Sequence, residues 1–342
     1  MRYIGGKTNL LTDIEKVIRT STQNVNTIID VFSGSGVVSA YLKARNYNVI
    51  GNDIMYFCYA LCRGTTALNQ PPTFNNLGIH NPIEFLNNLT LEDANINIED
   101  CFIYQHYSPH DENTRMYFQS KNAIKIDIIR ITIEKWRSEH LINENEYFYL
   151  LAALISAVPY VSNIAGVYGA YLKHWDARTY HTIRLKQPQI VMNGGNATFY
   201  NKNCDELLPE QNIVGDLLYA DPPYNSRQYL PNYHVLETIA AYDEPDIHGV
   251  TGMRDYRHQR SDFCTVRGVE GAFRRMIENA QVRYVLISYN NEGLLSTERL
   301  SALCREYAQP NTFHLYEIDY RRYSNAGTKP GGVIEQLYFF EK

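Results

Sequence analysis

The sequence predicts an α/β protein in which a mostly parallel sheet is interrupted by a long helical insertion. Short β-branched and aromatic runs occur near the N-terminus and again after about residue 198, and the first run leads through a glycine turn into a helical segment. Residues 54–197 break this rhythm and are mostly helical in pattern. Because strands that alternate with helices build sheets covered on both faces, the two outer regions are expected to form one sheet.

The N-terminal region starts the predicted sheet. Residues 27–32 form an apolar run, and the stretch Ser33-Gly34-Ser35-Gly36 follows it directly. Residues 37–44 then have helical character, and 47–51 form a second predicted strand that leads into Asn52-Asp53. A strand, a glycine turn, a helix and a second strand are the opening of a Rossmann-like sheet.

The middle of the chain supplies the helical signals. One helix is expected over 123–136, because its apolar side chains recur on roughly one helical face: Ile124, Ile128, Ile131 and Trp136. A second apolar helix is expected over 147–158, ending near Pro159.

Strand signals return after the insertion, and two of the late ones suggest a hairpin. The predicted strands cover 198–200, 216–220, 284–289, 312–321 and 333–340, and the last two flank a loop rich in glycine, proline and lysine. The sequence therefore predicts a sheet domain built from 1–53 and 198–342, with 54–197 inserted as a helical region to which 225–275 contributes.

The composition is that of an ordinary globular protein. The chain has 342 residues, a net charge of −5 and six cysteines, none in a C-x-x-C pair. We therefore expect reduced thiols and neither a disulfide framework nor a metal site. No apolar run approaches the roughly 18 residues of a membrane helix, and the N-terminus lacks a signal-peptide core, so a cytoplasmic protein is expected.

The glycine turn and the acidic residue after the second strand indicate a nucleoside-type cofactor. Glycines at 34 and 36 permit a cofactor to approach the backbone closely, although Val38-Ser39 replace the third glycine of dinucleotide binders. Asp53 has the position of a carboxylate that holds ribose hydroxyls. A helix cap is the alternative role for Asp53.

The motif Asp221-Pro222-Pro223-Tyr224 follows a predicted strand and is the most specific signal in the chain. Two prolines remove backbone N–H donors, so an amine placed there meets only the Asp221 carboxylate and a main-chain carbonyl as acceptors. Tyr224 supplies an aromatic face on which a base can stack. A rigid strand-to-loop turn is the alternative reading.

The chain resembles the Dam-like family of adenine-N6 DNA methyltransferases, in the branch that accompanies restriction systems. The segments that carry the resemblance occur in the family's order: Tyr3 to Lys7, Asp30 to Gly36, Asn52-Asp53 and Asp221 to Tyr224, with longer similar stretches at 122–127, 161–170 and 225–229. The family implies a seven-stranded methyltransferase sheet, S-adenosylmethionine as cofactor, and double-stranded DNA as substrate. It also implies that the helical insertion recognises the target.

The resemblance also implies roles for individual residues. Asp221, Pro222, Pro223 and Tyr224 would be catalytic. Asp53 would hold the ribose, and Asp30 would bind the methionine ammonium. Asp205 would receive the adenine amine of the cofactor; this match is looser, and its alternative is an ordinary surface position. The remaining cofactor residues would line the methionine end and the pocket wall: Tyr3, Lys7, Phe32, Gly34 and Gly36.

A basic segment follows the catalytic motif. Residues 254–275 hold six arginines against three acidic residues, which reverses the sign of the chain's net charge locally. Such a segment suits contacts with DNA phosphates. The alternative interpretation is that its arginines lie on a solvated helix face and have no binding role. The candidates for DNA contact are Arg254, Arg257, Arg260 and Arg267.

The predicted function is methylation of an adenine flipped out of duplex DNA. The enzyme would be a bacterial or phage-encoded, nucleoid-associated partner of a separate restriction endonuclease. Two alternatives remain open at this point. One is an rRNA guanine methyltransferase, some of which share the D-P-P-Y motif, and the other is a nucleic-acid-binding protein with a degenerate cofactor site.

Overall fold

The computed structural model describes residues 6–111, 113–319 and 334–342. Packing divides the chain into two compact units. The sheet unit takes Lys7–Ile54, Asn193–Gln228 and the described residues from Gln259 onward. The helical unit takes Gly6, Met55–Met192 apart from residue 112, and Tyr229–His258. The segment 225–275 is thus shared between the two units.

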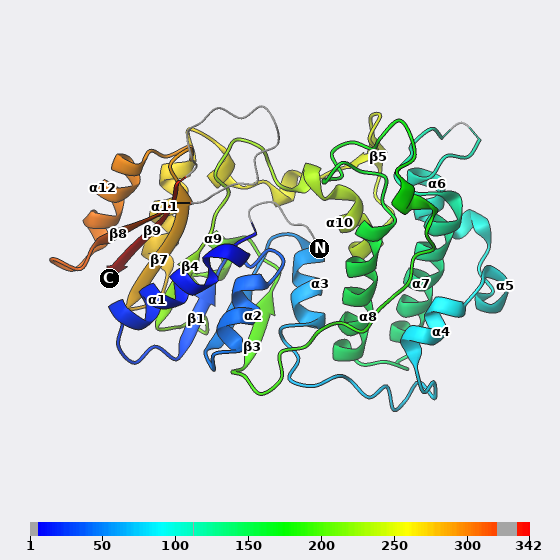
Figure 1. The fold of residues 1–342 in the computed structure, drawn as a ribbon, viewed down its shortest axis with the longest axis horizontal. Helices are drawn as coiled ribbons and strands as arrows, with labels where there is room; N and C mark the ends of the chain where they lie inside the picture. Colours follow the sequence, from blue (N-terminus) through cyan, green and yellow to red (C-terminus); the bar gives the residue numbers. More distant parts are fainter. Residues whose placement is uncertain (1–5, 112, 320–333) are drawn as a thin grey trace. The chain divides into compact units, whose positions relative to one another are not determined.

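The sheet unit contains seven strands in the order β3-β2-β1-β4-β7-β9-β8, which confirms the expected fold class (Figure 1). The first five strands run parallel, and β9 pairs antiparallel with both β7 and β8. The seven strands predicted from the sequence are present, with the bounds β1 Thr27–Asp30, β2 Asn48–Asn52, β3 Ala197–Tyr200, β4 Leu217–Ala220, β7 Tyr284–Asn290, β8 His314–Asp319 and β9 Ile334–Glu341.

The register brings the functional segments to one edge of the sheet. Asp30, the last residue of β1, pairs with Gly51 on one side and with Tyr219 on the other. Because parallel strands end at the same edge, the glycine turn after β1, Asp53 after β2 and Asp221 after β4 all leave the sheet there.

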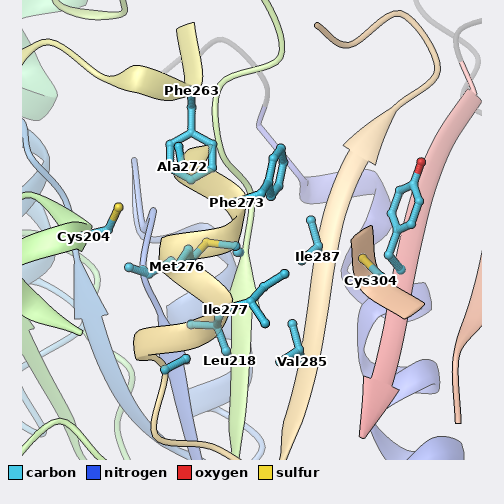
Figure 2. Close-up of a cluster of buried hydrophobic side chains, with 14 of the residues drawn as sticks. Cys204, Leu218, Phe263, Ala272, Phe273, Met276, Ile277, Val285, Ile287 and Cys304 are labelled. Carbon is cyan, nitrogen blue, oxygen red and sulfur yellow. The ribbon is translucent and has the colours of Figure 1, made fainter. Parts of the chain in front are cut away.

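Helices cover both faces of this sheet. On one face α1 (Leu11–Ser21) and α2 (Val37–Lys43) pack on residues such as Ile28 and Leu217. On the other face lie α9 (Cys204–Leu207), α11 (Val269–Asn279) and α12 (Thr297–Tyr307), and Figure 2 shows Phe273, Met276 and Ile277 of α11 against Leu218, Val285 and Ile287. Because both faces are covered, β4 and β7 are buried along their whole length, and their residues are mostly apolar.

The helical unit is built around two long helices, α7 (Ser120–Ser138) and α8 (Glu144–Ala157), which pack against each other (Figure 1). Both were expected from the sequence, but the predicted apolar face of α7 was incomplete. Ile126, Ile129 and Ile133 are fully buried, whereas Ile124 and Ile131 are only partly buried. Both α6 and α8 pack on α7, and its buried residues are not confined to the predicted face. The unit also contains α3 Tyr56–Gly64, α4 Pro82–Asn88, α5 Leu91–Ala94, α6 Phe102–Tyr107, α10 His234–Ala241, β5 Ile247–His248 and β6 Met253–Arg254.

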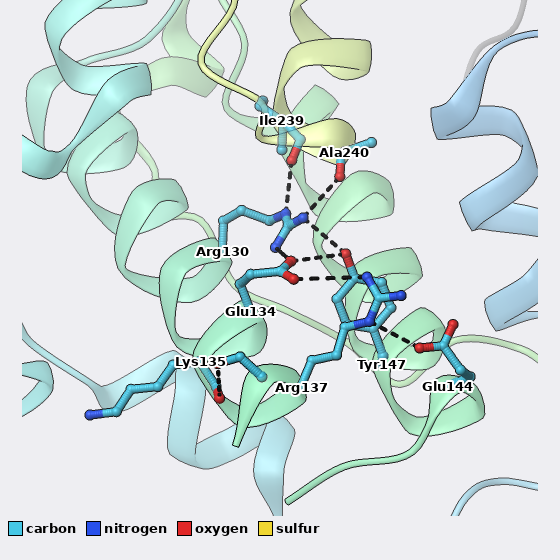
Figure 3. Close-up of polar contacts among 9 residues, drawn as sticks. Arg130, Glu134, Lys135, Arg137, Glu144, Tyr147, Ile239 and Ala240 are labelled. Atoms are coloured by element: carbon cyan, nitrogen blue, oxygen red, sulfur yellow. Dashed lines mark hydrogen bonds and ion pairs between the residues drawn. The ribbon is translucent and has the colours of Figure 1, made fainter. Parts of the chain in front are cut away.

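Arg130 connects three helices inside the helical unit. Its side chain on α7 is 1% exposed and donates hydrogen bonds to the carbonyls of Ile239 and Ala240, in the last turn of α10 (Figure 3). It also binds the Tyr147 hydroxyl of α8 at 2.9 Å and the Glu134 carboxylate at 2.7 Å. A helix end has unpaired carbonyls and a partial negative charge, so a buried guanidinium caps α10 there.

All six cysteines are buried free thiols, as expected. Among the described residues, no group of His, Cys, Asp and Glu side chains has the arrangement of a metal site. None of the helices in the described ranges combines the length and the apolar character of a membrane span.

Candidate active site

The Asp-Pro-Pro-Tyr motif leaves the sheet directly after β4. Pro222 is buried, and the Tyr224 carbonyl accepts a hydrogen bond of 2.9 Å from the backbone N–H of Leu294. The Tyr224 ring meets the Tyr289 ring of β7 edge to face, with the ring centroids 5.2 Å apart. Strand β7 therefore supports the ring of the motif, and the loop that follows β7 holds its backbone.

Lys7 lies at the centre of a polar cluster around this motif. Its ammonium is 3.0 Å from Glu335 Oε2 of β9 and 3.3 Å from Asp221 Oδ1. It also donates to the Tyr224 hydroxyl, which itself donates to Asp221 Oδ1. Residues from the N-terminal segment, the β4 loop and the last strand thus share one set of hydrogen bonds.

Burial and the neighbouring charges shift the pKa values of Asp221 and Lys7 in opposite directions. Burial raises the pKa of Asp221 to about 6, although the nearby ammonium of Lys7 opposes the rise. Burial also works against the charge on Lys7, but the carboxylates of Asp221 and Glu335 outweigh it and raise the pKa of Lys7. At neutral pH the cluster therefore holds one ammonium and an ionised Asp221.

The glycine turn after β1 is held by Asp53. Gly34 and Gly36 have φ values of 50° and 76°, in the left-handed region where glycine carries no steric cost. Asp53 Oδ2 accepts a hydrogen bond of 2.8 Å from the Gly34 N–H, and the Ser33 N–H donates to the Asn52 carbonyl at 2.8 Å. The ends of β1 and β2 are therefore joined through the turn.

Asp30 is buried at the end of β1 with one oxygen unsatisfied. The Ser39 hydroxyl of α2 donates to Oδ2, whereas Oδ1 has no hydrogen-bond partner among the described residues. Burial raises the pKa of Asp30 to about 7, and the carboxylates of Asp221 and Asp53 add to the rise. A buried carboxylate oxygen without a partner is a strong acceptor for a cationic group.

Two further predicted cofactor residues lie in the sheet unit. Asp205, at the start of α9, binds Arg275 of α11 at 2.8 Å. The ring of Phe32 packs edge to face on Phe263 at 5.1 Å. Tyr3 lies outside the described residues. Tyr3 and Lys7 were both predicted to line the methionine end of the cofactor, and of these two the structure describes Lys7, which lies beside the Asp-Pro-Pro-Tyr motif.

The four arginines proposed to contact DNA occupy different surroundings. Arg254 is 6% exposed, and its terminal nitrogens bind Asp243 at 2.9 and 2.6 Å, so the expectation of a phosphate contact is corrected: this side chain is a buried structural partner. Arg257 is 85% exposed and pairs with Asp255, and Arg260 and Arg267 are exposed. Arg257 belongs to the helical unit, and the latter two belong to the sheet unit.

Comparison with known proteins identifies the family of the chain. The sequence pattern described as D12 class N6 adenine-specific DNA methyltransferase matches residues 3–303. The chain belongs to this family. The match confirms the family that the sequence motifs had predicted, and in this D12-class chain it covers the glycine turn, Asp53 and the Asp-Pro-Pro-Tyr motif.

Curated relatives extend the match over the whole chain. Across 99% of its length the chain is 41% identical to the type II methyltransferase M.FokI of Planomicrobium okeanokoites and 37% identical to the modification methylase StsI of Streptococcus sanguinis, but it spans only 52% and 51% of those proteins. It is 33% identical to the type II methyltransferase M.NlaIII of Neisseria lactamica, over 100% of this chain and 99% of the relative. The D12-class chain thus spans about half the length of the first two relatives.

Two residues of this candidate site were not predicted from the sequence. Glu335 binds Lys7 from β9, and Tyr289 supports the Tyr224 ring from β7. Glu335 and Gln336 are adjacent buried polar residues within a predicted strand that is otherwise apolar. That interruption was the available signal for Glu335, whereas Tyr289 follows the apolar pattern of its strand and carries no distinguishing signal.

Proposed function

We propose that this protein transfers a methyl group from S-adenosylmethionine to the exocyclic N6 of an adenine flipped out of duplex DNA. The observation that carries the proposal is the Asp-Pro-Pro-Tyr motif at the end of β4, beside the unpartnered carboxylate oxygen of Asp30 on β1. We further propose that the enzyme protects DNA in a restriction–modification system with a separate endonuclease, acting at the nucleoid in the cytoplasm. Membership in the D12 class supports adenine in DNA over guanine in rRNA.

The residues at the edge of the sheet fit the proposed cofactor. When bound, S-adenosylmethionine supplies a methyl group that its sulfonium makes electrophilic. Asp30 Oδ1 is a buried acceptor suited to the methionine ammonium, and Asp53 is suited to the ribose hydroxyls. Lys7 would approach the methionine carboxylate, and the remaining positions would form the pocket and the adenine contact: Phe32, Gly34, Gly36 and Asp205.

The Asp-Pro-Pro-Tyr residues would hold and polarise the target amine. The Asp221 carboxylate and the Pro222 carbonyl accept its hydrogens, so that the nitrogen lone pair is turned toward the methyl group. Asp221 also stabilises the positive charge that develops on the nitrogen. Because Asp221 titrates at a pKa of about 6, it is mostly an anion at neutral pH and loses this capacity as the pH falls through that value. Tyr224 and Pro223 shape the slot for the base.

One assay tests the proposed reaction and its alternatives together. Purified protein would be incubated with cofactor carrying a labelled methyl group and with either duplex DNA or rRNA. We expect label in DNA, on N6 of adenine after hydrolysis to nucleosides. Label in rRNA guanine, or binding without transfer, would overturn the proposal. Single-molecule sequencing of DNA from a host that expresses the protein would then identify the recognition site.

Replacing Asp53 with alanine is expected to weaken the cofactor more than it slows the reaction at saturating cofactor. A charge-assisted bond to a ribose hydroxyl contributes roughly 1.5–3 kcal/mol at most. Loss of one such bond should therefore raise the Kd for the cofactor by about tenfold to a hundredfold. Isothermal titration with the cofactor measures this change. The matched control is Asp216→Ala, because Asp216 also accepts two backbone N–H bonds of 2.8 Å, from Asn26 and Thr27. Equal Kd values for the two variants would contradict a ribose contact.

Neutralising Arg257, Arg260 and Arg267 together is expected to weaken DNA binding and to flatten its dependence on salt. Each lost phosphate contact should reduce the log–log slope by up to about 0.9. The Arg257–Asp255 pair is solvated and costs little to break. Fluorescence anisotropy of labelled duplex at several salt concentrations measures the slope.

The control for this measurement is the triple replacement of Arg19, Arg283 and Arg299, which are also exposed arginines in ion pairs. It makes the same change in net charge. If both triple variants give the same slope, the proposed contacts are excluded. A changed preference at one base pair with an unchanged slope would instead assign one of the three side chains to base reading.

A further inference from the structure

The Asp221 carboxylate, which the proposed reaction needs as an acceptor for the target amine, already lies within ion-pair distance of Lys7. Asp221 Oδ1 receives the Tyr224 hydroxyl and lies 3.3 Å from the Lys7 ammonium. The same ammonium lies 4.7 Å from the centre of the Tyr224 ring. Lys7 therefore contacts both groups that would receive the target base, the carboxylate and the aromatic ring.

A neutral amine competes poorly against this arrangement. Hydrogen bonds between a carboxylate and an ammonium are charge-assisted and stronger than bonds to a neutral donor. An adenine amine carries no charge, so it displaces Lys7 from Asp221 only if the ammonium keeps another anionic partner. A buried ammonium left without any partner would be costly.

Glu335 provides that second partner. Its Oε2 lies 3.0 Å from the Lys7 ammonium, closer than Asp221 does. Glu335 is buried near the start of β9 and pairs with Asn290 at the end of β7. Side chains alternate between the two faces along a strand, so Glu335 shares its face with Leu337 and Phe339, which pack on the side of the sheet that α1 covers. In the described part of the chain, Lys7 is the sole cation within ion-pair distance of Glu335.

We propose that Glu335 is a positioning residue that retains Lys7 when Asp221 turns to the target amine. The inference rests on the proposed methylation of adenine. When the base enters, Lys7 keeps its bond to Glu335 and releases Asp221 and the Tyr224 ring. Without the Glu335 carboxylate, Asp221 is the one side-chain carboxylate left to Lys7 in the cluster, so the ammonium stays on it more of the time even when the methionine carboxylate is bound.

The central test compares Glu335→Gln with the double variant Lys7→Met/Glu335→Gln. Single-turnover methylation would be measured at saturating DNA and at cofactor concentrations far above the separately titrated Kd of each variant. We expect Glu335→Gln to slow the reaction about tenfold to a hundredfold, the effect of one charge-assisted bond. The double variant should be several-fold faster than Glu335→Gln, because the blocking ammonium is gone. A role limited to packing would not be rescued by a second buried substitution.

Glu341→Gln is the matched control. Glu341 is also an ion-paired glutamate of β9, but it binds Arg283 at the opposite end of the strand. This variant should retain the wild-type rate. If Glu335→Gln loses its fold, Glu335→Asp and Lys7→Met/Glu335→Asp carry the same comparison, because the shorter carboxylate draws away from Lys7.

The pH dependence of the rate gives a readout that altered packing does not produce. The charge of Glu335 raises the pKa of Asp221, and that of Lys7 lowers it. The acidic limb of the rate profile should therefore lie at lower pH in Glu335→Gln than in the wild type. In the double variant, which also lacks the charge of Lys7, it should lie at higher pH than in Glu335→Gln. The other titratable groups that face this cluster are Tyr224, Tyr219 and Asp30, and all three are retained in every variant.

The outcomes separate this inference from the proposed function. A wild-type protein that methylates no adenine in DNA would overturn both. If the wild type is active, a Glu335→Gln rate equal to that of Glu341→Gln overturns the role of Glu335 alone. A double variant as slow as Glu335→Gln also overturns it, because Glu335 would then act independently of Lys7.

Discussion

An Asp221→Ala protein is expected to bind the cofactor nearly as well as the wild type and to transfer essentially no methyl groups. Asp221 faces the site of the amine, whereas the proposed cofactor contacts come mainly from β1, the glycine turn and Asp53. Loss of one preorganised electrostatic group typically costs about a hundredfold to a thousandfold in rate, and Asp221 is proposed both to position the amine and to stabilise its charge. Calorimetric titration with the cofactor, beside a methylation assay, measures both quantities.

The Asp221 result needs a check on the surrounding cluster, since removal of this carboxylate also frees Lys7. Asp221→Asn keeps the volume of the side chain and one acceptor oxygen, and its rate should fall between those of the wild type and Asp221→Ala. Thermal unfolding of all three proteins checks the fold. Near-normal turnover by Asp221→Ala would refute the proposed mechanism.

Replacing Arg130 with alanine should destabilise the helical unit by about 3–5 kcal/mol. The change leaves the carbonyls of Ile239 and Ala240 without their buried donor and removes one of the partners of Glu134 and of Tyr147. Denaturant unfolding followed by tryptophan fluorescence measures the change, because both tryptophans, Trp136 and Trp175, belong to this unit.

Arg137→Ala is the matched control for Arg130. Arg137 lies on the same helix and pairs with Glu134 and Glu144, but its side chain is 37% exposed. Exposed pairs contribute about 0–1 kcal/mol, so the loss should be small. Equal losses for the two variants would show that burial of the Arg130 cap on α10 adds no stability beyond that of an exposed ion pair.

The fold was largely predictable because its signals are local. Each strand is a short apolar run, and the glycine turn and the Asp-Pro-Pro-Tyr motif each lie directly after one of them. The parallel register then brings the ends of β1, β2 and β4 to one edge without further information. The amphipathic pattern of α7 was less informative, because a helix packed on several sides has no single apolar face.

The contacts that were not predicted join residues far apart in the sequence. Lys7 and Glu335 are separated by 328 positions, and nothing local to either residue indicates the other. Arg254 was misjudged for a related reason: the local count of charges gave its sign but not its burial or its pairing with Asp243. Charge patterns therefore predicted a basic segment, while tertiary packing decides which of its side chains can meet a phosphate.

The position of β9 bears on how the enzyme is made. This strand lies between β7 and β8, yet its residues are synthesised after those of every other strand in the sheet. A nascent chain that has reached residue 333 has β7 and β8 without the strand that joins them, and it lacks Glu335. Unpaired strand edges attract other chains, so the addition of β9 both covers the edges of β7 and β8 and completes the carboxylate pair around Lys7. The polar cluster around Lys7 and the closed sheet therefore both depend on the same strand, β9.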